Sequence, residues 1–301
     1  MKASALGFVG FGEAGFHLAK GLRSAGIDKI AAFDIHTQTP GYSELIRQRA
    51  EETQTRLLES NADLAEASEI VFSTVTANQA AAAAEQTAPH LGSKHFYADL
   101  NSVSPALKQS IARTIEATGA RFVEVAVMAA VPPHLHRVPM LTGGPWAAEF
   151  AERLTPFGMR IEIGDSQIGS AAATKMCRSI MIKGMESLLA ECVLGASRYG
   201  AEQRVFASLA ETFPQIDWPK LASYMISRLV VHGERRAREM EEVAETLRSI
   251  GIEPIMAEAA ARRQDWSALV GLKAHFGKEG PETYREFAET VAELASSKPV
   301  R

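Results

Sequence analysis

Residues 1–26 read MKASALGFVGFGEAGFHLAKGLRSAG, with glycines at positions 7, 10, 12 and 15 between an apolar run and a helical pattern. Glycine weakens both strands and helices, so this cluster needs a structural reason. Gly10-Phe11-Gly12-Glu13-Ala14-Gly15 fits G-x-G-x-x-G, in which the first glycine permits a tight turn, the second lets a pyrophosphate approach the backbone and the third lets the helix sit close to the strand. The amides around Gly12, Glu13 and Ala14 would face the phosphates from the positive end of the helix dipole. The stretch therefore predicts a strand, a phosphate-binding turn and a helix.

A second apolar run, KIAAFD, ends in Asp34, nineteen residues after Gly15. A carboxylate at this point accepts hydrogen bonds from a ribose diol and repels a 2′-phosphate. The sequence therefore predicts a dinucleotide site that favours NAD, while His36 and Thr37 leave NADP open. The alternative is a set of helix-packing glycines beside a solvated aspartate, which the combined context disfavours.

The first half of the chain alternates between apolar runs and helical segments, which is typical of a parallel sheet covered on both faces. Strands are expected at 5–9, 30–33, 70–75, 95–98, 122–127, 138–141 and 160–163, and helices at 15–25, 42–59, 79–90, 105–118 and 146–154. Farther along, helices are expected at 169–198 and 218–250, with shorter ones within 254–261, 266–275 and 281–296. We predict an α/β protein with a doubly wound Rossmann domain at 1–165 and an all-helical domain for substrate binding and dimerisation at 166–301.

Bulk composition excludes several classes of protein. The 301 residues carry a formal charge of −4, which gives no reason to expect nucleic acid as a partner. No run of about eighteen apolar residues is available to span a bilayer. The two cysteines, Cys177 and Cys192, are expected to be buried thiols in a reducing compartment. We expect a cytoplasmic protein that acts on a small molecule and forms a homodimer or higher homo-oligomer through its helical domain.

A dinucleotide-binding fold names a cofactor but not a reaction, and hydride transfer at an alcohol also requires a general acid/base. The candidate is Lys175, which lies in an alanine-rich helical stretch where desolvation would lower the pKa of its amine. Ser179 and Lys183 follow at i+4 and i+8 and share its helix face. Composition alone favours a solvated lysine. The pair His134 and His136 lacks a third ligand at helical spacing, so no metal site is expected.

These features together resemble the β-hydroxyacid dehydrogenase superfamily, the relatives of 6-phosphogluconate dehydrogenase, which join a Rossmann domain to an all-helical domain. GFVGFGEAG is similar to their cofactor signature, and ASEIVFSTVT resembles the strand that ends at the cofactor ribose, which implies that Val75 and Thr76 lie there. DLNSVSP resembles the D-x-S-T-x-x-P segment and implies that Asn101 and Ser102 face the substrate. GSAAATK resembles the helix with the catalytic lysine, which implies that role for Lys175.

The resemblance extends to RAREMEEVAETLRSIGIEP, where Arg238 and Glu239 take the places of a Lys-Asp pair, with Arg238 on the cofactor side. The chain departs from the family where Ser-Gly-Gly becomes Met128-Ala129-Ala130, and where the asparagine one turn after the lysine becomes Ser179. A divergent branch is therefore expected, with Ser179 and Lys183 assisting at the substrate.

The resemblance implies an NAD(P)-dependent oxidoreductase. It would transfer hydride between nicotinamide and a secondary alcohol of a β-hydroxy acid, a sugar acid or a β-hydroxy amino acid. Two alternatives stay open. One is an imine reductase, which usually lacks the lysine, and the other is a protein that binds NAD without turnover.

Overall fold

The computed structural model describes residues 5–297, which divide into two compact units between Lys175 and Met176. We call them the N-terminal unit and the helical unit. The division falls inside a long helix, α7 (Ser170–Ser197), whose first residues belong to the N-terminal unit. The boundary expected after residue 165 precedes that helix.

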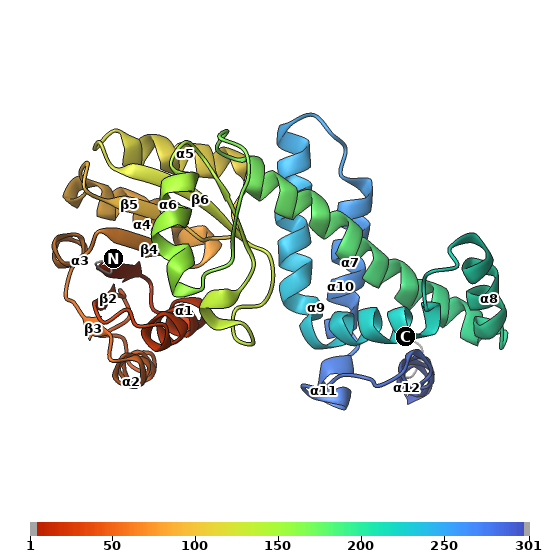
Figure 1. Ribbon diagram of the computed structural model, residues 1–301. Coiled ribbons are helices and arrows are strands. Elements are labelled where there is room, and N and C mark those ends of the chain that lie inside the picture. The colour runs from red at the N-terminus through yellow and green to blue at the C-terminus, as the bar shows by residue number, and fades with distance from the viewer. Residues whose placement is uncertain (1–4, 298–301) are drawn as a thin grey trace. The chain divides into compact units, whose positions relative to one another are not determined.

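The N-terminal unit is built on one eight-stranded sheet in the order β3-β2-β1-β4-β5-β6-β7-β8 (Figure 1). All neighbouring strands run parallel except β6 and β7, which are antiparallel. The predicted Rossmann fold is confirmed. β7 and β8 are parallel to each other and run opposite to the other strands. The short edge strand β3 was not indicated by the sequence pattern. The strands are β1 (Leu6–Val9), β2 (Ile30–Phe33), β3 (Arg56–Leu57), β4 (Ile70–Ser73), β5 (Phe96–Asp99), β6 (Arg121–Val127), β7 (Met140–Gly143) and β8 (Ile161–Ile163).

Helices cover both faces of this sheet, because successive strand residues point to opposite sides. Phe8 and Phe72, whose rings stack with centroids 5.2 Å apart, belong to the core beneath α1, α2 and α6. Val9 and Val71 belong to the core beneath α3, α4 and α5. The helices are α1 (Glu13–Ser24), α2 (Ser43–Thr53), α3 (Asn61–Ala67), α4 (Ala80–Thr87), α5 (Pro105–Glu116) and α6 (Ala147–Leu154), with 3₁₀ turns at Ala77–Gln79, Ala88–His90, Leu135–Arg137 and Thr155–Phe157.

β1 is buried along its whole length, as expected for a strand covered on both faces. Gly7 in this strand leaves room for the residue after α3, because a Cβ there would lie 2.4 Å from Ser68 Oγ. The first glycine of the opening cluster therefore serves helix packing, Gly10 and Gly12 belong to the turn between β1 and α1, and Gly15 lies in the first turn of α1.

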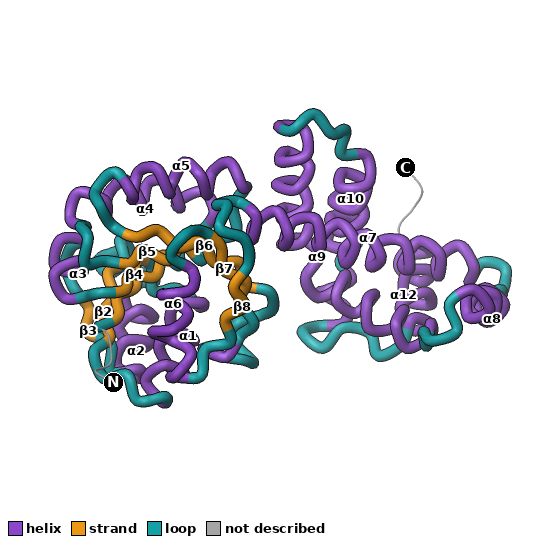
Figure 2. The backbone as a smooth tube through the Cα atoms, turned by 45° about the horizontal axis from the view of Figure 1, so that its top comes forward, coloured by secondary structure: helices purple, strands orange, loops and turns teal. Residues whose placement is uncertain are grey.

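The helical unit contains helices and no strand within its described residues (Figure 2). After α7 come α8 (Glu202–Thr212), α9 (Trp218–Ser249), α10 (Ile255–Leu269), α11 (Leu272–Phe276) and α12 (Tyr284–Ser297). α9 begins where Asp217 accepts a hydrogen bond from the Lys220 amide, and its core face carries Leu229 and Met240. The predicted all-helical region is confirmed. Over residues 5–297, no helix is both long and apolar enough to cross a membrane.

Candidate functional site

The glycine turn between β1 and α1 leaves no room for a Cβ at Gly10 or Gly15. Gly10 has a φ of +84°, and a Cβ there would lie 2.8 Å from Val75 Cγ1. A Cβ at Gly15 would lie 2.9 Å from Thr74 Oγ1 and 2.9 Å from the Gly10 carbonyl oxygen. A Cβ at Gly12 would meet nothing within 4 Å. The outer glycines are thus required by packing, whereas the middle one borders open space.

The start of α1 offers main-chain donors at this open space. Gly12 is the N-cap residue, with no side chain to cap the helix, and its carbonyl accepts the first helical hydrogen bond from the Phe16 amide at 3.1 Å. The preceding amides, including those of Glu13 and Ala14, have no acceptor within a helix of this geometry. Unpaired amides at the positive end of a helix dipole suit a phosphate group.

Asp34, just after β2, is tied to the glycine turn. One of its carboxylate oxygens accepts the Phe11 amide at 2.7 Å and the other accepts the His36 amide at 2.9 Å. The residue is only 8% exposed. Each carboxylate oxygen can accept further hydrogen bonds, so the group can also bind two ribose hydroxyls. The turn, the helix start and Asp34 together fit a dinucleotide.

Alanine at position 12 separates cofactor binding from folding. Gly12 has φ −71° and ψ −157°, which alanine adopts, so the free energy of unfolding should stay within about 0.5 kcal/mol of the unmodified protein. The new methyl group fills the space through which a pyrophosphate would approach, so the Kd for NADH should rise about tenfold or more. Fluorescence titration of NADH measures this. Gly92→Ala, also in open space, is the control and should change neither quantity. Unchanged NADH affinity in Gly12→Ala would refute the site.

The carboxyl ends of β4 and β5 lie beside this turn. Asn101 is 5% exposed, and its side chain hydrogen-bonds within the protein: Oδ1 accepts the Val75 amide at 2.8 Å, while Nδ2 donates to Ser73 Oγ and Asp99. Asp99 is in turn paired with the buried Lys108 at 3.1 Å. Asn101 therefore holds Val75, two residues after β4, beside the end of β5.

Other residues expected at the site are accessible. Ser102 and Thr76 are exposed, and Thr76 Oγ1 donates to Asn78 Oδ1 at 2.6 Å. At the end of β6, Met128 is half-buried and its amide donates to the Pro139 carbonyl at 2.9 Å, and Ala129 is exposed. The ends of β1, β4, β5 and β6 thus form one edge of the sheet, where ligands bind in folds of this type.

Lys175 is the sixth residue of α7 and is half-buried. It is the last residue of the N-terminal unit, so it belongs to the same compact unit as the glycine turn. Ser179 lies one turn farther along α7 and is also half-buried, and it belongs to the helical unit.

Lys183 lies among charged side chains within the helical unit. Its Nζ is 2.6 Å from Glu239 Oε2, and Glu239 also pairs with Arg235. Burial lowers the pKa of the Lys183 amine, and the neighbouring Glu239 carboxylate offsets this only in part. Burial acts to raise the pKa of Glu239, but the charge and hydrogen bond of Lys183, together with the charges of Arg235 and Arg236, outweigh it, so that pKa is lowered. Lys183 is therefore bound to a carboxylate of the protein itself.

Arg238 and its neighbour Arg236 have opposite environments on α9. Arg238 is exposed and pairs with Glu241 and Asp265. Arg236 is buried and contacts both oxygens of Glu186, a residue of α7 with no exposed surface. The structure thus brings Lys183 and Glu239 together but places Arg238 in a separate surface cluster.

Two buried glutamates, Glu124 and Glu186, were not predicted from the sequence. Glu124 lies in the middle of β6, and Glu186 is bound by Arg236, Arg228 and Gln264 Nε2. Each interrupts an apolar run, RFVEVAV in the first case and GMESLLA in the second. A single carboxylate in an apolar run indicates a buried group with a specific partner, because burying an unpaired charge is costly.

The expectation of two buried thiols is wrong. Cys177 is exposed, because its neighbour Met176 takes the packed side of α7 at this point. Cys192 is half-buried. The two histidines have different environments: His134 is exposed and His136 is buried. Burial lowers the pKa of His136.

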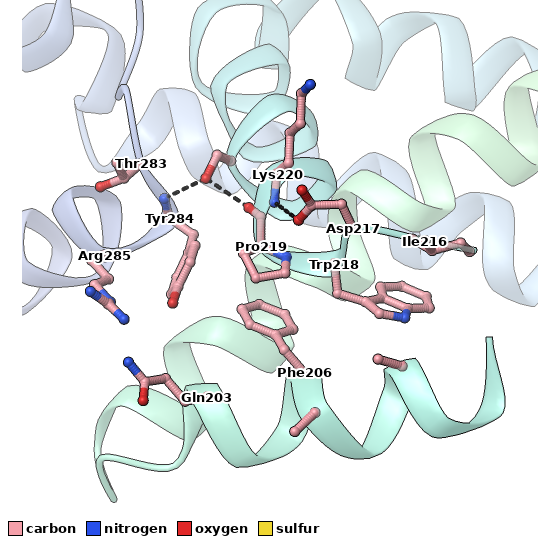
Figure 3. Close-up of a pocket in the computed structure, with 13 residues that line it drawn as sticks. Gln203, Phe206, Ile216, Asp217, Trp218, Pro219, Lys220, Thr283, Tyr284 and Arg285 are labelled. Carbon is pink, nitrogen blue, oxygen red and sulfur yellow. Dashed lines mark hydrogen bonds between the residues drawn. The ribbon is translucent and has the colours of Figure 1, made fainter. Parts of the chain in front are cut away.

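A cavity of about 660 Å³ lies within the helical unit, among α8 and the starts of α9 and α12 (Figure 3). Its walls include Phe206 and Tyr284, whose rings meet edge to face at 5.0 Å, together with Trp218, Lys220 and Arg285. None of the residues expected at the cofactor or substrate lines it.

The sheet, the glycine turn and Asp34 define a dinucleotide-binding protein with an appended helical unit. Comparison with known proteins agrees: residues 5–156 match the family described as the NAD binding domain of 6-phosphogluconate dehydrogenase. The chain belongs to this family. Residues 196–267 match a domain of unknown function. The resemblance inferred from the motifs is therefore confirmed.

Similar proteins support a divergent branch of the family. A conserved hypothetical protein from Sinorhizobium meliloti 1021 is 38% identical, with 97% of this chain and 96% of that chain covered and a TM-score of 0.84. A conserved protein of unknown function, described as structurally similar to 3-hydroxyacid dehydrogenases, is 30% identical over 87% of this chain and 96% of its own, with a TM-score of 0.76. Mitochondrial 3-hydroxyisobutyrate dehydrogenase from Drosophila melanogaster is 28% identical over 69% of this chain and 63% of its own length.

Proposed function

We propose that this protein is an NAD-dependent oxidoreductase in which Lys175 is the general acid/base for a substrate alcohol. The observation that carries the proposal is that Lys175 and the glycine turn belong to one compact unit built on the same sheet. Similarity to 3-hydroxyisobutyrate dehydrogenase supports a hydroxy acid as the substrate class. Sugar acids and β-hydroxy amino acids share the same reacting group and are included.

The protein's own groups would act as follows. Gly12 and the first amides of α1 hold the pyrophosphate, and Asp34 holds the adenine-side ribose. When bound, the nicotinamide ring accepts or supplies the hydride. Lys175 takes the proton from the substrate hydroxyl in oxidation and returns it in reduction. Ser102 orients the substrate, and Asn101 supports it by holding Val75.

Two features of the N-terminal unit set the specificity in this proposal. The Asp34 carboxylate repels a 2′-phosphate, which favours NAD over NADP. Met128 and Ala129 at the end of β6 carry no side-chain hydrogen-bond donor. The substrate carboxylate is therefore held by other groups in this proposal.

A substrate screen that follows NADH absorbance tests this proposal. The panel contains 3-hydroxy acids, sugar acids and β-hydroxy amino acids, and each is assayed with NAD and with NADP. We expect turnover of at least one compound, with NADH bound about tenfold or more tightly than NADPH. Turnover of cyclic imines with NADPH instead would favour an imine reductase. Tight NADH binding with no turnover of any compound would favour a protein that only binds the cofactor.

The same proposal places oligomer contacts on the helical unit. Large apolar side chains are exposed there, with Met181 64%, Leu188 58% and Leu269 75% exposed. Burial of such side chains against a second copy would stabilise a homodimer or a higher homo-oligomer. Light scattering measures the mass in solution, and a monomer would remove this part of the proposal.

A further inference from the structure

Glu124 is a buried carboxylate in β6 that binds the start of α7. The side chain has no exposed surface, and both oxygens accept main-chain hydrogen bonds: Oε2 from the Gly169 amide and Oε1 from the Ala172 amide, each at 2.6 Å. All of these residues belong to the N-terminal unit. Charge-assisted hydrogen bonds of this kind are roughly twice as strong as neutral ones.

These bonds replace the cap that the local sequence does not provide. The Ala173 amide donates to the Gly169 carbonyl at 2.9 Å, which makes Gly169 the residue that caps α7. Glycine has no side chain with which to accept an amide of the first turn. Glu124 supplies the acceptor from a strand 45 residues earlier in the chain, and its negative charge faces the positive end of the helix dipole.

Two glycines, Gly143 and Gly169, lie at this contact between Glu124 and the start of α7. Gly143 on β7 is paired with Glu124 across the ladder, and a Cβ at Gly143 would lie 2.8 Å from Glu124 Oε2. Gly169 has a φ of +103°, which few other residues adopt. Gln109 on α5 donates to the Ile168 carbonyl at 3.0 Å, so the residue before the cap is held as well.

We infer that Glu124 is a positioning residue that fixes where α7 presents Lys175. Lys175 follows Ala172 by three residues on the same rigid helix, so the two hydrogen bonds to β6 set its place relative to the sheet. The inference rests on the proposed role of Lys175. Misplacing a catalytic group by about 1 Å can cost about a hundredfold in rate, so such an anchor has a kinetic consequence.

Glu124→Gln tests this inference, because glutamine keeps the shape of the side chain but cannot accept both amides. We expect kcat to fall about tenfold to a hundredfold on the best compound of the screen, with KM and the Kd for NADH within about twofold of the unmodified protein. Amide hydrogen exchange in a peptide spanning residues 168–176 should accelerate about tenfold. Glu124→Asp should recover part of kcat. Glu162→Gln, an exposed glutamate on β8, is the matched control and should change none of these quantities.

A second variant tests the same contact from the other side. Gly143→Ala places a methyl group against Glu124 Oε2 and should give the same combination of lower kcat and faster exchange. An unchanged kcat in a folded Glu124→Gln protein overturns the inference. So does loss of folding in both variants, because the contact would then serve the fold alone.

Failure of the proposed function can be told apart from failure of this inference. If no compound is turned over, the rate at which an amine-reactive ester acylates Lys175, read by mass spectrometry, replaces kcat. That rate should change at least about threefold in Glu124→Gln if the anchor places the amine, while exposed Lys94 reacts as before. Equal rates at Lys175 overturn the inference. If the unmodified enzyme is active and Lys175→Met is equally active, the residue being positioned is not Lys175 and the inference falls too.

Discussion

Replacing Lys175 with methionine is expected to lower kcat about 10²–10⁴-fold, the range that general acid/base groups contribute. Methionine keeps the length and apolar stem of lysine but has no amine to exchange a proton with the substrate hydroxyl. Because Lys175 is not part of the glycine turn, the Kd for NADH should stay close to that of the unmodified protein. Steady-state kinetics on the best compound of the screen and fluorescence titration of NADH measure the two quantities.

The matched control lies on the same helix. Arg178→Met also exchanges a long cation for methionine, but Arg178 is exposed, so kcat should change little. A turnover number for Lys175→Met equal to that of the control would exclude Lys175 as the acid/base. The protein would then remain a dinucleotide-binding member of its family without an assigned proton-transfer group.

Removing the charge of Glu186 is expected to lower the free energy of unfolding of the helical unit by about 3–5 kcal/mol. Glu186 has no exposed surface, and it contacts buried Arg236 and Gln264 Nε2. Glu186→Gln keeps the side-chain volume but leaves the Arg236 guanidinium buried without its carboxylate. Urea unfolding followed by tryptophan fluorescence in a Trp146→Phe background, which leaves Trp218 and Trp266 of the helical unit, measures the loss.

A more exposed ion pair, which joins α7 to α10, provides the comparison. Glu191 pairs with Arg263, but its side chain is 70% exposed, so Glu191→Gln should cost less than about 1 kcal/mol. The double variant Glu186→Leu, Arg236→Met should recover part of the loss, because an apolar pair does not require desolvation of charges. If Glu186→Gln is as stable as Glu191→Gln, the buried cluster does not stabilise the fold.

Local patterns predicted the strands and the glycine turn well, because these depend on residues close in sequence. The run expected at 30–33 coincides with β2 (Ile30–Phe33). The run at 42–59 was wrongly expected to be one helix. The helix ends at Thr53, Gln54 takes a left-handed φ of +52°, and Arg56–Leu57 pairs with β2. Residues 43–59 contain neither a glycine nor a proline, so the local sequence does not predict the end of the helix.

The direction of a strand in the sheet could not be predicted from the sequence pattern. An apolar run predicts a strand but not whether it pairs parallel or antiparallel with its neighbour, and β7 runs antiparallel to β6. The connection between them contains only a 3₁₀ turn at Leu135–Arg137, without the crossover helix that usually joins parallel neighbours. The helix signal at 105–118, by contrast, correctly places α5 between β5 and β6.

The candidate site was predictable where its geometry is local and unpredictable where partners are distant in sequence. The open space at Gly12 follows from a motif of six residues. The hydrogen bond between Asn101 and Val75 spans 26 positions, and the bonds from Glu124 to the start of α7 span 45 or more. Such contacts depend on which strands become neighbours, and only the folded sheet reveals that.

The double hydrogen bond at Asp34 has a consequence for cofactor engineering. Nucleotide preference in dehydrogenases is commonly sought by exchanging this one acidic residue for a neutral or basic one. Here the same carboxylate also accepts hydrogen bonds from the Phe11 and His36 amides. Its removal would therefore destabilise the turn that has to bind either dinucleotide. A redesign toward NADP would have to supply new acceptors for those two amides before it supplied a cation for the extra phosphate.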